Sequence, residues 1–271
     1  MKRLLSIAAI GVLAVTALVM VRCNSVTGGA PTDVALAAAT DSTVKVTWTA
    51  PSEGTPDKYI VMFSETGTDA YEPFDTVITT EATHNPAGKT GTYKVVAKFG
   101  STDYDGTPTP TTTPISSAVI SVSELNAAGS SGYGWTRADG SATTYTMTQA
   151  SNAASVDFYI TDFATGYSGP DYSVASPDLG PSDPTGVVPS GSWRINGFTA
   201  GLSNENSALP MHSTSTYFNY QEISTQPFLT GCYTADGYYA LVKVDSYNTG
   251  SGTAQVRSWF QKVKGLRLIE H

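Results

Sequence analysis

Charged residues are scarce in this chain: Asp, Glu, Lys and Arg make up 14% of its 271 residues. Long runs of the helix formers Glu, Lys, Leu and Arg are missing, whereas Gly, Ser, Thr, Asn, Tyr and Ala dominate. This balance is typical of secreted β proteins and argues against a helical cytosolic fold. The length suffices for two ordinary domains, each with its own core. We therefore predict a two-domain, all-β protein.

Clusters of basic residues are also missing. Without residues 1–22, the chain keeps 12 of its 15 basic residues against 23 acidic ones, which is a net charge of −11. Phosphate backbones are bound by grouped Lys and Arg side chains. Nucleic acid is therefore not expected as a partner, and the acidity is interpreted as a contribution to solubility.

The N-terminus has the residue order of an export signal. Lys2 and Arg3 precede an uncharged, mostly apolar run of 18 residues from Leu4 to Val21. This length lies at the boundary between the hydrophobic region of a signal peptide and a membrane-spanning helix. Residues 1–22 are therefore predicted to be a signal peptide or an N-terminal membrane anchor, and the protein is expected to be exported.

Cys23 directly follows this run, and its position resembles that of the lipid-bearing cysteine of bacterial lipoproteins. Met20 supplies the apolar residue three positions earlier, whereas Arg22 stands where that family has a small residue. The resemblance implies that Cys23 is lipidated and that the protein is anchored to the bacterial outer membrane or cell surface. An uncleaved anchor and cleavage after Gly28 are the alternatives. Residues 23–30 would form a short polar tether.

The sequence has only two cysteines. If Cys23 carries a lipid, Cys232 is single, and its neighbours Phe228, Tyr233 and Tyr238 predict that it is buried as a small apolar residue. A disulfide between Cys23 and Cys232 is the alternative, although it would tie a flexible leader to a distant domain.

Between residues 31 and 123, apolar and polar residues alternate in several short stretches. Strands are expected at 34–36, 44–48, 59–63, 74–80, 93–99 and 115–122. Turn-forming residues separate them. About seven short strands over this length is the signature of an immunoglobulin-like sandwich.

Residues within this region resemble the fibronectin type III family. The resemblance is carried by Pro31, Trp48, Pro51, Ser52, Tyr59 and the run Tyr93-x-Val95-x-Ala97. It implies a fibronectin III-like domain over residues 31–123, in which Trp48 packs in the core and Tyr93 forms a corner by bonding to upstream backbone. Both residues would be structural.

The composition changes near residue 125, and a second domain is predicted over residues 126–271. Strands are expected at 143–147, 155–161, 193–198, 216–221, 238–246, 253–263 and 266–269. A long loop is expected from Gly166 to Pro189. Phe158 and Ile160 alternate with Asp157 and Tyr159, so the latter two are expected to face outward. We predict a second antiparallel, jelly-roll-like β-sandwich.

No catalytic or metal-binding residue is predicted. His84, His212 and His271 lack metal-ligand spacing, and no Gly-x-Ser-x-Gly elbow is present. Carboxylates that could pair in a hydrolase are Asp157, Asp162, Glu205, Glu222, Asp236 and Asp245. The acidic loops 103–106 and 171–183 lack the full calcium-loop pattern, so turn chemistry is favoured there and calcium is the alternative cofactor.

Aromatic residues of the second domain are the best indication of function. Tyr133, Trp135, Tyr167 and Tyr172 lie in Gly-, Ser- and Pro-rich stretches and are the candidate ligand-binding residues, because exposed rings stack on sugars. The favoured hypothesis is a non-enzymatic cell-surface protein in adhesion or structural interaction, with the first domain as spacer and the second as recognition domain. Its partner would be a glycan or another surface protein. A carbohydrate-binding module is the alternative, and a glycoside hydrolase or other extracellular hydrolase is the third hypothesis.

Overall fold

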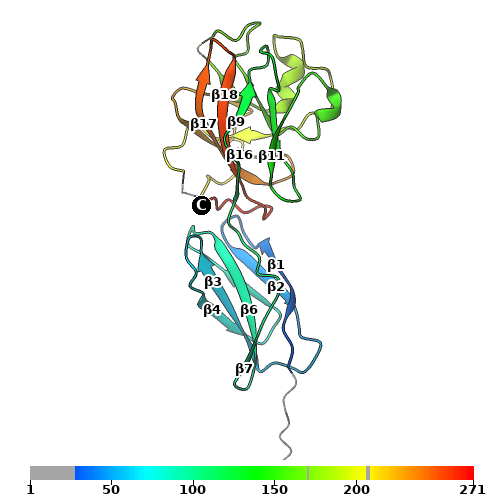
Figure 1. The fold of residues 1–271 in the computed structure, drawn as a ribbon, viewed down its shortest axis with the longest axis vertical. Helices are drawn as coiled ribbons and strands as arrows, with labels where there is room; N and C mark the ends of the chain where they lie inside the picture. Colours follow the sequence, from blue (N-terminus) through cyan, green and yellow to red (C-terminus); the bar gives the residue numbers. More distant parts are fainter. Residues whose placement is uncertain (1–27, 170, 206–207) are drawn as a thin grey trace, which may run out of the picture.

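The computed structural model describes residues 28–169, 171–205 and 208–271, which form two stacked β domains (Figure 1). The predicted signal or anchor at 1–22 and the predicted lipidation site Cys23 lie outside the described residues. No helix within the described ranges is long and apolar enough to cross a bilayer.

The first domain is a sandwich of two sheets. One sheet contains β1 (Thr32–Ala38), β2 (Val44–Thr49) and β5 (Glu81–His84), in the order β1-β2-β5. The other contains β4 (Glu72–Val77), β3 (Lys58–Glu65), β6 (Gly91–Phe99) and β7 (Thr102–Asp105), in the order β4-β3-β6-β7. The three-on-four arrangement of antiparallel strands confirms the predicted fibronectin III-like sandwich.

Trp48 and Tyr93 lie in the core of this sandwich, as the resemblance implies. The expected bond from Tyr93 to upstream backbone is replaced by a side-chain bond. The Tyr93 hydroxyl and the Nδ1 atom of His84 are 3.0 Å apart, and the His84 ring stacks on Phe74 with centroids 4.1 Å apart. His84 ends β5 and places its ring within reach of the tyrosine, so this histidine has a structural role.

The strand predicted at 115–122 does not complete the first sandwich. It forms β8 (Ile115–Ser116) and β9 (Ile120–Ser123), and both pair with β18 (Thr253–Phe260) of the second domain. The predicted sheet was wrong because the alternation of apolar and polar residues indicates that a strand is half-buried. It does not indicate which other strand it pairs with. The last strand of the first sandwich is β7, which lies in the acidic stretch that was predicted to be a turn.

The carboxylates of β7 are used in cross-strand pairing with β6. Asp103 pairs with Lys98, and the Asp105 carboxylate is 2.7 Å from the Lys94 ammonium group. Opposite charges facing each other across two strands stabilise the pair modestly. These ion pairs give Asp103 and Asp105 a role in the pairing of β7 with β6.

The second domain is also a sandwich of two sheets, as predicted. The five-stranded sheet has the order β11 (Ala142–Tyr145), β10 (Gly132–Trp135), β12 (Phe158–Thr161), β13 (Ser173–Ala175) and β15 (Tyr220–Glu222). The six-stranded sheet has the order β14 (Gly197–Phe198), β16 (Phe228–Tyr233), β17 (Tyr239–Asn248), β18 and β8, with β9 also on β18. Two short 3-10 helices, η1 (Ala150–Asn152) and η2 (Pro177–Ser182), complete the elements.

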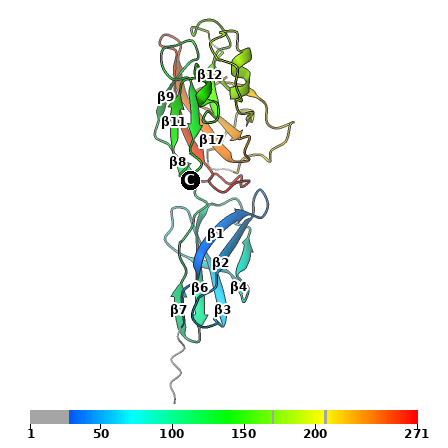
Figure 2. The same cartoon turned by 90° about the vertical axis from the view of Figure 1, so that its right-hand side faces the viewer.

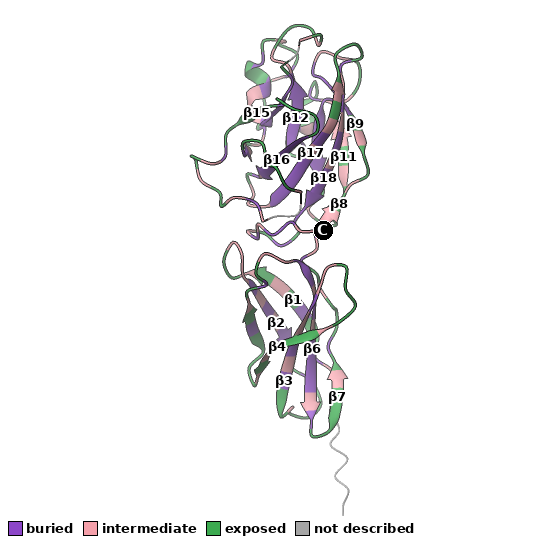
Figure 3. Ribbon diagram, turned by 90° about the vertical axis from the view of Figure 1, so that its left-hand side faces the viewer, coloured by how far each residue is buried: buried purple, intermediate pink, exposed green. Residues whose placement is uncertain are grey.

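Both sheets of the second domain are covered on their outer faces as well as between them. One cluster fills the space between the sheets, a second includes Met147, Tyr159 and Trp193, and a third includes Leu209, Leu241 and Trp259. Figure 3 shows β16, β17 and β18 largely buried. The predicted loop 166–189 contains β13 and η2 and forms part of this cover.

β12 is therefore buried on both sides, and the prediction that Asp157 and Tyr159 face solvent was wrong. Both side chains have 0% exposure. Cys232 is also fully buried within the core between the sheets, as predicted, and burial raises the pKa of its thiol.

Residues 261–271 leave β18 and pack against the first domain. The predicted strand at 266–269 does not form. Instead, Leu266 and Leu268 are fully buried in the core cluster of the first sandwich. Arg267 Nε lies 2.8 Å from Asp41 Oδ2, and the Gln261 amide donates to the carbonyl of Thr112 over 2.7 Å. The two domains thus meet at the end of the chain (Figures 1 and 2).

Candidate functional site

A hollow of about 400 Å³ opens on the second domain. Three segments that are distant in the sequence line it. They are residues 195–197, the loop residues His212, Thr214 and 217–219, and residues 233–235 at the β16–β17 turn. The lining combines aromatic rings with amide and hydroxyl groups.

Large apolar side chains are exposed at the rim of this hollow. Ile195 is 70% exposed and Phe218 is 47% exposed, and Met211 in the adjoining loop is 66% exposed. Phe218 also borders two smaller hollows on either side. Exposed apolar side chains gathered beside a concavity are typical of binding surfaces.

The ring system within the hollow is rigidly supported. His212 stacks on Tyr233 with ring centroids 3.9 Å apart and planes 17° apart. The Tyr217 hydroxyl donates to the carbonyl of Pro210 over 3.0 Å, and the backbone N–H of His212 donates to the Tyr239 hydroxyl over 3.1 Å. Partial burial lowers the pKa of His212, so its ring is neutral near pH 7. The loop therefore holds a neutral aromatic face toward the hollow.

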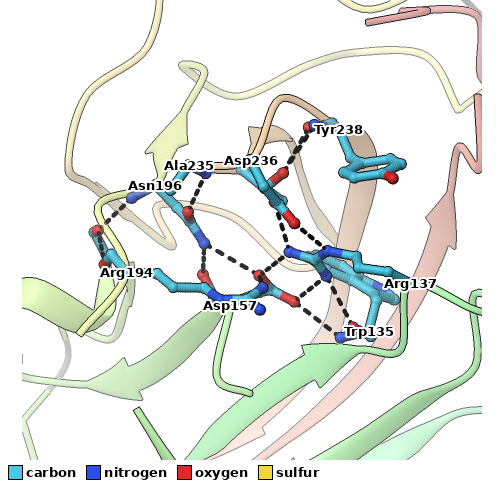
Figure 4. Close-up of polar contacts among 10 residues, drawn as sticks. Trp135, Arg137, Asp157, Arg194, Asn196, Ala235, Asp236 and Tyr238 are labelled. Carbon is cyan, nitrogen blue, oxygen red and sulfur yellow. Dashed lines mark hydrogen bonds and ion pairs between the residues drawn. The ribbon is translucent and has the colours of Figure 1, made fainter. Parts of the chain in front are cut away.

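An ionic cluster centred on the buried Asp157 adjoins the hollow and joins four segments (Figure 4). The Asp157 carboxylate accepts two hydrogen bonds of 2.8 Å from Arg137 and one of 2.7 Å from Arg194. Arg137 in turn binds Asp236, with its Nε atom 2.7 Å from Oδ2. Burial alone would lower the pKa of Arg137, but these carboxylates raise it. For Asp236 the effects are opposite in sign: burial would raise the pKa of this carboxyl, but the hydrogen bonds from Arg137 hold its pKa at about 2.

Asn196 connects the ionic cluster with the hollow. Its side-chain amide donates to the Asp157 carbonyl over 2.7 Å, and its side-chain oxygen accepts from the Ala235 N–H over 2.7 Å. Asn196 and Ala235 both line the hollow. The cluster therefore fixes the relative positions of two of its walls, and its arginine–carboxylate pairs have a positioning role.

The structure separates the predicted ligand-binding aromatics from this hollow. Tyr133, Trp135 and Tyr172 have exposures of 0%, 3% and 0%, so the prediction that they are exposed was wrong. Tyr133 and Trp135 lie on β10, which the sequence presented as a Gly-rich linker, and both bind Ser258 Oγ in the core. The Tyr172 hydroxyl donates to the carbonyl of Tyr167, whose own side chain is half-buried.

Four of the six carboxylates considered for hydrolysis form ion pairs with basic side chains. Asp157 and Asp236 bind arginines, and Lys243 pairs with both Glu205 and Asp245. Within residues 28–169, 171–205 and 208–271, no three His, Cys, Asp or Glu side chains are grouped as metal ligands.

The residues that form the hollow were visible in the sequence but not singled out. The stretch Leu209–Tyr220 combines a histidine, three Tyr or Phe residues and several Ser and Thr residues, which suits a binding loop. Which of its rings are exposed depends on contacts with β16 and the β16–β17 turn. Sequence spacing does not contain that information.

No protein-family model matches the sequence, and no curated protein matches it significantly. Among solved structures, the chain is similar to the FN5 domain of Drosophila Lar, with 20% identity and a TM-score of 0.27 over 31% of this chain and 94% of that one. It is also similar to a structure of titin kinase and its flanking domains, with 10% identity and a TM-score of 0.29 over 88% of this chain and 38% of that one. Neither match assigns a ligand or an activity to this chain.

Proposed function

We propose that the chain is a non-enzymatic cell-surface protein in which the first domain is a spacer and the second domain recognises a partner. The hollow of the second domain is the recognition site, and its ligand is a carbohydrate. Adhesion to a glycan-bearing surface is the resulting activity. The stacked His212–Tyr233 pair with exposed Phe218 beside it is the observation that carries this proposal.

The position of Gly28, at the start of the first domain, supports the spacer role of that domain. Gly28 lies close to the rings of Phe99, the last residue of β6, and Tyr104 in β7. β7 lies at the end of the first sandwich farthest from the second domain (Figures 1 and 2). A membrane attachment through Cys23 would then leave the second domain projecting outward. Mass spectrometry of the mature N-terminus tests this part: a lipid on Cys23 supports it, and an unmodified start after Gly28 or an intact Met1 contradicts it.

The chemistry of the hollow supports a carbohydrate ligand. Aromatic faces stack on the C–H groups of a pyranose ring, while neighbouring amides and hydroxyls bind its hydroxyl groups. Phe218 offers an exposed ring, and Asn219 and Thr214 lie beside it in the lining. A neutral lining suits a neutral sugar better than a charged one.

A glycan-array screen of the chain from residue 24 onward tests the ligand. We expect binding that falls about tenfold or more in Phe218→Ala, because one stacked ring contributes roughly 1 kcal/mol or somewhat more. Tyr71→Ala, which removes a half-buried surface ring of the first domain, is the matched control and should bind normally. Absence of binding to every glycan would refute the carbohydrate assignment.

The non-enzymatic part of the proposal is tested on the same bound glycan. After prolonged incubation, the oligosaccharide should be recovered intact by chromatography. Shortened products that disappear in Asp236→Asn or Glu205→Gln would instead establish the hydrolase hypothesis.

A further inference from the structure

A second hollow lies where the two domains meet. It has a volume of about 690 Å³ and is lined by residues 36–38 of β1, by Thr40, and by residues 262–265 of the C-terminal segment. Because Leu266 and Leu268 are buried in the first sandwich, the C-terminal wall of this groove is fixed relative to β1. Both walls of the groove are therefore held by the core of the first domain.

One wall of the groove is an open sheet edge. β1 is the terminal strand of its sheet and pairs with β2 alone among the described strands. Near its start, a bulge between Thr32 and Ala35 and backbone bonds between Thr107 and both Pro31 and Val34 close this edge. Beyond the bulge, residues 35–38 carry only Ala and Leu. Proteins ordinarily protect such an edge with a charge, a proline or a covering segment.

The opposite wall presents two lysines in an alternating arrangement. Val263 is buried in the first sandwich, whereas Lys262 and Lys264 on either side of it are exposed and line the groove. Neither lysine forms an ion pair with a residue in 28–169, 171–205 or 208–271, unlike Lys89, Lys94 and Lys98. Two unpaired cations thus face a groove on a chain whose net charge is −8.

We propose that this groove binds an extended acidic peptide segment of a partner protein, which adds as a strand to the open edge of β1. The backbone of β1 beyond the bulge would supply main-chain hydrogen bonds, as in other cases of strand addition. Lys262 and Lys264 flank the bend at Val263 and both line the groove, so carboxylates on the groove-facing side of the added peptide would meet two cations.

The groove is tested with an acetylated eight-residue peptide of alternating Val and Glu, titrated into the chain from residue 24 onward. We expect saturable binding with amide chemical-shift changes centred on residues 35–38. Lys262→Glu and Lys264→Glu should each weaken binding at least fivefold. Lys58→Glu is the matched control, since Lys58 is exposed but lies outside the groove, and it should change affinity less than twofold.

A fully N-methylated version of the peptide separates strand addition from attraction of charge. It keeps every carboxylate but has no N–H donors, so we expect its affinity to fall at least tenfold. Equal affinity of the two peptides would overturn the proposal in favour of a general anion site. Shift changes centred outside β1 and residues 262–265, or absence of binding at millimolar peptide, would also overturn it. The Phe218→Ala variant should bind the peptide normally, which keeps this result independent of the carbohydrate site.

Discussion

Leu268 is the fourth residue from the end of the sequence, yet its side chain belongs to the core of the first domain. Its side chain has 0% exposure and packs in the same cluster as Trp48 and Tyr93. Both of these residues precede Leu268 by more than 170 positions in the sequence. Replacing a fully buried Leu by Ala costs about 2–5 kcal/mol, depending on how far the cavity collapses. Leu268→Ala should therefore destabilise the first domain by about 3 kcal/mol.

Hydrogen exchange followed by mass spectrometry locates this effect. Amides of β6, at the centre of the four-stranded sheet, report on the first sandwich, and those of β17 report on the second. A loss of about 3 kcal/mol corresponds to roughly a 150-fold faster exchange through opening. We expect this acceleration in β6 of Leu268→Ala, with a smaller change in β17.

Leu241→Ala is the matched control, because Leu241 is equally buried but lies on β17 in the second domain. Its exchange should accelerate most in β17. If Leu268→Ala instead accelerated β17 and left β6 unchanged, the C-terminal segment would not be part of the first core, and the reasoning about the domain junction would be refuted.

Three further predictions concern the second domain. Burial raises the pKa of Glu124 to about 7 from an ordinary value of 4.5, so the folded state holds this proton more tightly and stability should fall by about 3 kcal/mol as pH rises from 4.5 to above 7. Urea denaturation across this range should show the decline, and Glu124→Gln should abolish it; an unchanged slope in this variant contradicts the assignment. Asp157→Asn should cost about 3 kcal/mol in the same assay, since it leaves two arginines short of their buried partner. Asp245→Asn in the half-buried pair with Lys243 should cost less than about 1 kcal/mol, because Lys243 keeps its ion pair with Glu205. Trp135→Ala should lower the free energy of unfolding by about 3–5 kcal/mol; normal stability with lost glycan binding would restore Trp135 as a ligand contact.

The fold class and several structural residues could be predicted because they depend on local pattern. Alternation of apolar and polar residues determines where half-buried strands form, and it located β2, β3, β6 and β17. The positions of Trp48 and Tyr93 followed from the same periodicity together with the fibronectin III resemblance. The burial of Cys232 followed from its aromatic surroundings.

Burial on the second face of a sheet could not be predicted in this way. Asp157 occupies a position that alternation assigns to solvent, but Arg137, Arg194 and Asn196 reach it from other segments and bury it. Tyr133 lies in a Gly-rich stretch that resembles a linker, yet it pairs in β10 because β11 and β12 flank that strand. In both cases the covering residues come from elsewhere in the chain.

The sequence by itself therefore determined that the chain forms two β-sandwiches and which residues support the first core. Only the tertiary structure decided which strands share a sheet, where 115–123 and 261–271 belong, and which rings remain exposed. The physical reason is that periodicity records whether one face of a segment is apolar, whereas sheet order and exposure depend on contacts between distant segments. Both candidate surfaces are of this second kind: the hollow at His212 and Phe218 joins three segments, and the groove beside β1 joins the first and last parts of the described chain.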